Sequence, residues 1–231
     1  MKKILKYSLG EKNNFIPKLF YPSQKYLPEW YRREKKFDGG DPKIFGIRDA
    51  NLTYKSCIPF FDSLTNGYMV ELWTDIFVKK NESGIPIITW DVGPTPVYPR
   101  NPIESFIQPH EHNEHHFAWF NPYTIKTPSN YGLILGHPFN RFDLPFTTLT
   151  GITDADTLLT TGQVPFFIKN NFEGVIKAGT PMFQIIPFKR ESWKHVEDKN
   201  LIKLNDEQLY LSGRILSGFY KKNLWKRRTF E

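Results

Sequence analysis

Short runs of β-forming residues, each closed by a turn signal, recur through the middle of this chain and constrain its fold more than any other feature. Valine, isoleucine, threonine and aromatic residues dominate the runs, and glycine, proline, asparagine or aspartate separates them. Turn signals at this spacing are typical of a β-sandwich or barrel. The pattern predicts strands at 68–78, 85–92, 117–127, 131–136, 146–152, 164–168, 174–177 and 182–188.

The two ends of the chain differ from this central region. Residues 1–55 are rich in aromatic side chains without steady periodicity, which predicts an arm with one short helix at 28–33. Strands are expected from about Tyr54, so that residues 56–192 form the β domain. Asn205 and the acids after it resemble a helix start and predict a helix over 206–221. Residues 193–231 are therefore expected to form a C-terminal helix and a basic tail.

Cysteine usage and hydropathy predict a protein of a reducing compartment. The chain of 231 residues has one cysteine, Cys57, which allows no intramolecular disulfide. Cys57 is expected to be a buried thiol in an apolar strand. The first residues lack the apolar run of a signal peptide, and no window reaches the length of a membrane span. We therefore expect a virion or host-cytoplasmic location and no membrane partner.

The charge is positive but mostly dispersed. Lysine and arginine outnumber the acids by 31 to 24, a formal charge of +7. This balance suits an anionic partner, although dispersed cations are also ordinary surface solvation. The basic residues do not interleave with an aromatic platform, so nucleic-acid binding is not expected despite the basic C-terminal tail.

Three segments resemble motifs of the trimeric dUTPase and dCTP deaminase group. The run from Gly151 to Asp156 is similar to the third motif of that family, and residues 172–186 are similar to a downstream stretch with a turn glycine and a glutamine. The run from Leu64 to Tyr68 is similar to the first motif. The resemblance implies a mostly β fold, a dUTPase-like β-clip or distorted jelly-roll barrel, whose members usually form trimers.

The resemblance also implies which residues would act if the chain were an enzyme. Asp154 matches the carboxylate that orients the attacking water, whereas Met69 stands where the first motif has its acid, and Glu71 is the nearest substitute. Arg141 and Gln184 are the candidate nucleotide-binding residues. The serine of the phosphate-binding motif and the glycine-rich closing motif have no counterpart here. An alternative interpretation makes Asp154 and its neighbour Asp156 a β-turn.

A second resemblance spans nearly the whole chain. It rests on four groups of residues: the run from Pro28 to Tyr31, the run from Lys55 to Phe60, residues 121–128, and the run from Gly179 to Glu191. These are similar to an uncharacterised family frequent in marine T4-like bacteriophages and other large viruses. The resemblance implies a viral origin and carries no activity.

Four histidines cluster between Pro109 and Phe117. His110, His112 and His116, with His137 from a later strand, have the residue type of a zinc or non-haem iron site. The alternatives are a solvated polar loop that binds no cofactor and a pH-sensitive interface.

These observations favour a non-catalytic, virus-encoded β-barrel protein that acts through protein–protein contacts as a virion structural or assembly component. The expected partners are further copies of the chain or other virion proteins, with Trp30, Tyr31 and Trp225 at the contact. Two alternatives remain open: a diverged nucleotide hydrolase or deaminase that uses Asp154, and a metal-binding protein.

Overall fold

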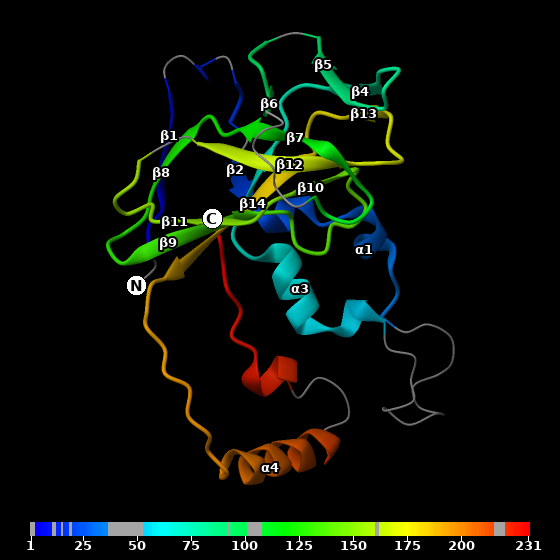
Figure 1. Cartoon of the computed structure of the whole chain (residues 1–231). Helices are drawn as coiled ribbons and strands as arrows, with labels where there is room; N and C mark the ends of the chain where they lie inside the picture. Colours follow the sequence, from blue (N-terminus) through cyan, green and yellow to red (C-terminus); the bar gives the residue numbers. More distant parts are fainter. Residues whose placement is uncertain are drawn as a thin grey trace. The chain divides into compact units, whose positions relative to one another are not determined.

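A computed structural model describes residues 3–10, 13–14, 16–18, 20–36, 53–91, 93–100, 108–159, 162–214 and 220–231 (Figure 1). The chain divides into two compact units. The β unit comprises Met1–Leu27, Leu64–Arg190 and Phe230–Glu231, and the helical unit comprises Pro28–Ser63 and Glu191–Thr229. The segment 1–55, expected as one arm, is thus shared between the two units.

The described strands form four separate antiparallel sheets. Their orders are β1-β8, β10-β12-β7-β6, β11-β9-β14-β3-β2 and β13-β4-β5. The strands are β1 (Lys6–Leu9), β2 (Phe20–Pro22), β3 (Tyr68–Glu71), β4 (Ile76–Lys80), β5 (Pro86–Trp90), β6 (Val97–Pro99), β7 (His112–Phe120), β8 (Tyr123–Lys126), β9 (Tyr131–Gly136), β10 (Phe146–Thr148), β11 (Gly151–Thr153), β12 (Gln163–Lys169), β13 (Gly174–Ile176) and β14 (Pro181–Lys189).

The fold is mostly β, as predicted, but none of the sheets formed by the described strands closes into a barrel. Each sheet keeps two different edge strands, and closure would require its first and last strands to pair. The chain instead changes sheets at short breaks, such as the step from β10 to β11, where a three-residue strand in one sheet is followed by a three-residue strand in another.

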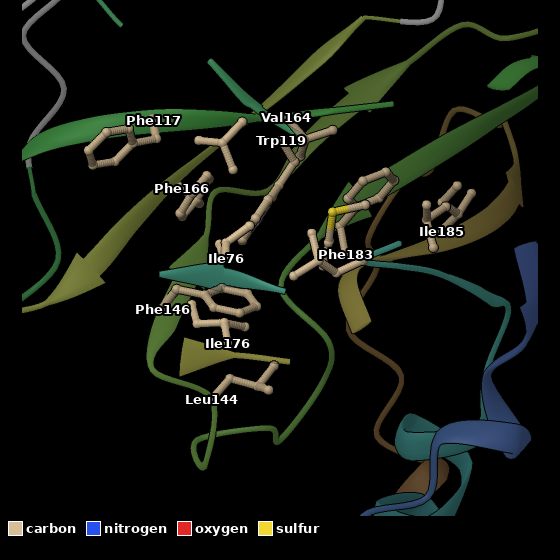
Figure 2. Close-up of a cluster of buried hydrophobic side chains, with 14 of the residues drawn as sticks. Ile76, Phe117, Trp119, Leu144, Phe146, Val164, Phe166, Ile176, Phe183 and Ile185 are labelled. Atoms are coloured by element: carbon tan, nitrogen blue, oxygen red, sulfur yellow. The ribbon is translucent and has the colours of Figure 1, made fainter. Parts of the chain in front are cut away.

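The core of the β unit is one cluster of buried apolar side chains to which all four sheets contribute. Trp119 of β7 stacks on Phe166 of β12 with ring centroids 3.7 Å apart, and Phe146 of β10 meets the indole edge-on at 4.9 Å. Phe183 and Ile185 join the cluster from β14 (Figure 2). Aromatic pairs at these separations add attraction beyond the burial of their area.

The β-strand predictions are confirmed in outline. Residues 131–136 form β9 with the expected bounds, because turn residues flank this short run of β-forming residues at both ends. Three predicted strands are each divided in two: 68–78 contains β3 and the start of β4, 117–127 overlaps β7 and β8, and 146–152 contains β10 and the start of β11.

The helices are α1 (Glu29–Arg33), α3 (Ile58–Thr65), α4 (Leu201–Arg214), the 3-10 turns η2 (Ser23–Tyr26) and η3 (Tyr54–Ser56), and the π-turn η4 (Tyr220–Leu224). The short helix expected at 28–33 is confirmed by α1. The strand expected from Tyr54 is wrong, because η3 and α3 occupy this segment. Pro59 lies in the first turn of α3, where backbone N–H groups have no intrahelical acceptor. The missing N–H of proline therefore costs the helix no hydrogen bond. Cys57 lies between η3 and α3 and is exposed, so the prediction of a buried thiol is also wrong.

The C-terminal helix begins five residues before its predicted start at Asp206. The side chain of Asp198 accepts the Asn200 N–H at 2.9 Å, and its carbonyl accepts the Leu201 N–H at 3.2 Å. This turn starts the helix, so Asn205 and the acids after it lie inside α4 instead of capping it. No helix in the described part of the chain is long and apolar enough to span a membrane.

Candidate functional site

Asp154 and Asp156, at the turn after β11, are bound to one arginine. Arg190 lies just after β14, and its guanidinium contacts Asp154 Oδ1 at 3.1 Å and Asp156 Oδ2. Asp156 Oδ2 also accepts the Asn130 N–H at 2.8 Å. The β-turn expected here is present, since the Asp154 carbonyl accepts the Thr157 N–H at 3.0 Å, but both carboxylates bind partners outside the turn. Asp154 is therefore engaged in an ion pair where a water-orienting base would need a free carboxylate.

Glu71, the other candidate acid, lies at the end of β3 and binds the N-terminal part of the β unit. Its Oε2 accepts the Tyr26 hydroxyl at 2.7 Å. Burial raises the pKa of the Tyr26 hydroxyl above its ordinary value, and the hydrogen bond to the Glu71 carboxylate raises it further. Tyr26 therefore remains a donor throughout the physiological pH range.

The sheet register places the two candidate acids far apart. Thr153, next to Asp154, is level with Leu133 and Pro187, whereas Glu71 is level with Pro181 at the other end of β14. Six residues along a strand and three strand spacings across a sheet correspond to roughly 20 Å and 14 Å. Asp154 and Glu71 therefore cannot act on one small reacting group.

Arg141 and Gln184, the candidate ligand-binding residues, brace loops. Arg141 forms a two-pronged ion pair with Asp143, Nε to Oδ1 and Nη2 to Oδ2 both at 2.9 Å, and donates to the Tyr26 carbonyl at 3.3 Å. Gln184 is buried on β14; its Oε1 accepts the Phe139 N–H at 2.8 Å and its Nε2 donates to the Asn66 carbonyl at 2.6 Å. Both side chains thus hold the chain's own backbone.

The histidine cluster does not form the expected polar loop, because His112 and His116 lie in β7 and are buried. His112 donates from Nδ1 to the His110 carbonyl at 2.8 Å, and its Nε2 accepts the Thr147 hydroxyl at 2.9 Å. The His116 ring packs against Phe167, whereas His110 is exposed. Among the described residues, no group of three or more histidine, cysteine, aspartate or glutamate side chains is placed to hold a metal.

His137 is a half-buried histidine just after β9, and its hydrogen bonds hold the imidazole in its neutral form. Its Nε2 donates to the Arg141 carbonyl at 3.0 Å and its Nδ1 accepts the Thr148 N–H at 3.3 Å. Burial lowers the pKa of the imidazole, and the nearby Lys169 and Arg141 charges add to the effect. The His137 side chain is thus a part of the loop structure and is disfavoured as a cation.

We expect acid to destabilise the protein through His137. Because the folded-state pKa lies below the ordinary value of about 6.5, the unfolded chain binds the proton first. The free energy of unfolding should therefore fall as the pH drops below about 6.5 and stop falling once the folded imidazole is also protonated. Urea denaturation of the wild type and His137→Gln at several pH values tests this. If the free energy of unfolding depends on pH in His137→Gln as it does in the wild type, the expectation is wrong. His110→Gln, at an exposed position, is the control and should keep the wild-type pH dependence.

The aromatic residues expected at an intersubunit contact pack inside the helical unit. Trp30 meets Tyr54 and Phe60 edge-on, with centroids 5.6 Å and 6.3 Å away. Tyr31 is buried and lies under the Lys55 ammonium at 4.3 Å. The Trp225 indole N–H donates to Asp62 at 2.9 Å. These side chains form a small aromatic core of their own unit.

A different set of apolar side chains is exposed, in the segment 191–210, which we call the C-terminal segment. Trp193 is 87% exposed, Val196 73% and Ile202 66%. Every residue of α4 whose side chain is described, from Leu201 to Tyr210, is exposed. Leu201, Ile202 and Leu204 have a spacing that suits one face of a helix. They lie before the predicted helix start at Asp206, so the predicted helix does not include this apolar face.

Comparisons with known proteins supply no relative for this arrangement: no family model, no curated protein and no solved structure matches the chain.

Proposed function

We propose that this chain is a non-catalytic protein that assembles with further copies of itself through the C-terminal segment. We further propose that it is a virus-encoded component of a particle or of its assembly, and that the β unit is a diverged form of the dUTPase-like β-clip. The resemblances in the sequence motivate the viral origin and the fold family. The observation that carries the assembly proposal is the exposed apolar surface of residues 191–210.

A short helix like α4 gains most of its stability from packing against another surface. Helices shorter than about 12–15 residues are marginal in water, and α4 has 14 residues. At 100° per residue, Leu201, Ile202 and Leu204 fall within one half of the helix circumference, with Lys203, Asp206 and Glu207 on the other half. A one-sided apolar face of this kind indicates a helix that is stabilised by packing against another surface.

Charge favours a second copy of the same chain as that surface. The C-terminal segment carries five acidic and three basic side chains, whereas the whole chain carries 24 acidic and 31 basic ones. The segment is therefore negative and the remainder strongly positive. Opposite potentials steer partners together and fix their orientation, so the acidic segment of one copy suits the basic surface of another.

The catalytic alternative has less support. Asp154 is paired with Arg190, Glu71 accepts a hydrogen bond from the Tyr26 hydroxyl, and the register separates the two acids. Arg141 and Gln184, which would bind a nucleotide, hold backbone groups and an aspartate of the chain itself. Nucleotide chemistry at these residues would require several of these contacts to break first.

Removal of the exposed apolar side chains should abolish self-association without loss of fold. The variant Trp193→Ser/Ile202→Ser/Leu204→Ser removes three side chains that are each more than half exposed. We expect the wild type to sediment as an oligomer in the micromolar range and the variant as a monomer. The unfolding free energy of the monomeric variant should change by less than about 1 kcal/mol relative to wild type at high dilution, because exposed substitutions cost little.

A matched control removes three exposed apolar side chains from the β unit, by Ile87→Ser/Phe142→Ser/Val175→Ser. This control should keep the wild-type mass. If the wild type is a monomer throughout the micromolar range, or if both triple variants dissociate equally, the C-terminal segment is not the assembly surface.

A further inference from the structure

The chain changes sheets between β10 and β11, and a cavity of about 330 Å³ opens at this corner. β10 pairs with β12 in the four-stranded sheet, whereas β11 pairs with β9 in the five-stranded sheet. Where the chain crosses, the Leu149 N–H donates to the Pro165 carbonyl at 2.8 Å. The two sheets have no strand in common. Residues of β8, β9, β11 and β12 line the space between them.

A missing side chain creates part of this space. Gly151 begins β11 directly opposite Leu135 of β9, so a side chain at Gly151 would share the face of Leu135. A Cβ built at Gly151 would meet no atom within 4 Å. Leu133 and Leu135, two residues apart on β9, both line the cavity, which places the open position at Gly151 beside the apolar wall.

The lining is mostly apolar, and none of the described residues that form it carries a charged side chain. The walls are formed chiefly by Ile125, Leu133, Leu135, Ala155, Leu158 and Val164. Two lining amides are already engaged: Asn121 binds the Tyr123 backbone through both of its amide atoms, and Gln163 accepts from Arg100 at 2.9 Å. The hydroxyls of Thr150 and Thr153 remain as hydrogen-bonding groups of the lining.

We propose that this corner is a binding site for a neutral, hydrophobic small molecule. Ligand pockets in proteins measure about 300–1,000 Å³ and combine an apolar wall with a few polar groups, and this cavity has that size and lining. A charged ligand would lose its hydration without gaining a partner of opposite sign. A molecule of two or three fused or linked aromatic rings, with one hydrogen-bonding group for a threonine hydroxyl, matches the site. This proposal stands apart from self-association, because no residue of the C-terminal segment lines the cavity.

Titration of the full chain with N-phenyl-1-naphthylamine, a neutral dye whose fluorescence rises in apolar surroundings, tests the site. We expect saturable binding of one dye per chain. Gly151→Phe, which places a ring in the open position without a strained φ, should weaken binding by at least about tenfold. Leu158→Glu, at a half-exposed lining position, should weaken it similarly by adding a charge, and it covers the case in which Gly151→Phe does not fold.

Val175→Phe is the matched control, since it adds a phenyl ring at an exposed strand position of another sheet and should leave dye binding unchanged. Absence of saturable binding, or equal binding by the wild type and both pocket variants, would overturn the proposal. Dye binding that occurs only in the variant lacking Trp193, Ile202 and Leu204 would assign the cavity to a second copy of the chain and would also overturn it.

Discussion

Trp119→Ala is expected to cost about 3–5 kcal/mol of unfolding free energy, the usual range for truncation of a buried aromatic side chain. The indole is fully buried and stacks on Phe166 at 3.7 Å. Its N–H donates to the Thr148 hydroxyl at 3.1 Å, which in turn donates to the Met182 carbonyl at 2.7 Å. Alanine therefore leaves a cavity at the junction of the four-stranded and five-stranded sheets and also removes this hydrogen bond.

Chemical denaturation of the wild type and a graded pair of variants measures this effect. Trp119→Phe keeps a ring in the stack and loses the N–H, so its loss should lie between those of the wild type and Trp119→Ala. Phe142→Ala removes an aromatic ring that is 77% exposed and should change the free energy by no more than about 0.5 kcal/mol. A loss below about 1 kcal/mol for Trp119→Ala would mean that the indole is not part of the packed core.

Gly67→Ala is expected to destabilise the protein by about 2–5 kcal/mol, the sum of a backbone cost and a steric cost. Gly67 has φ of +69°, a conformation that a side chain disfavours by about 1–2 kcal/mol. A Cβ at this position would also lie 2.1 Å from the Ile185 carbonyl oxygen, so the backbone of β14 would have to move. The Gly67 carbonyl accepts the Ser23 N–H, which ties the displaced turn to the start of η2.

Gly84→Ala separates the two costs of the Gly67 substitution. Gly84 has φ of +75°, but a Cβ there would meet no atom within 4 Å. This variant should lose only the backbone term of about 1–2 kcal/mol. Equal losses of unfolding free energy in the two variants would show that the close approach of β14 to Gly67 does not contribute.

Gly67 and Gln184 bear on how the resemblance to the dUTPase group is interpreted. Both lie in segments that are similar to motifs of that group, and both have a structural role in this chain. Gly67 has no side chain to clash with the backbone of β14, and Gln184 hydrogen-bonds the backbone of Phe139 and of Asn66. Residues of this kind can persist for the sake of the fold. The fold of this chain therefore accounts for both residues without a retained reaction.

The sequence predicts strands well where turn signals enclose a short run of β-forming residues, as at residues 131–136. It fails at α3, where Phe60 and Phe61 are typical strand formers. In the structure both lie in a helix and pack against Tyr31, about 30 residues earlier in the chain. Propensity is a small energy, and such contacts override it.

The candidate sites show the same limit. The motif resemblance singled out Asp154, but not its ion pair with Arg190, because the two meet only when β11 and β14 enter one sheet. The histidine spacing likewise did not reveal that His112 would use both ring nitrogens within the fold. The cavity at Gly151 depends on where two sheets part, which no local pattern of residues encodes.

Hydrogen exchange across α4 at two protein concentrations is the most direct test of self-association through the C-terminal segment. A solitary helix of this length opens readily, so its amides exchange fast unless another surface covers it. We predict slow exchange of the Leu201–Arg214 amides at a concentration where the chain is assembled, and fast exchange after dilution to monomer. Fast exchange at both concentrations, with the strands of the β unit protected throughout, would contradict the proposal.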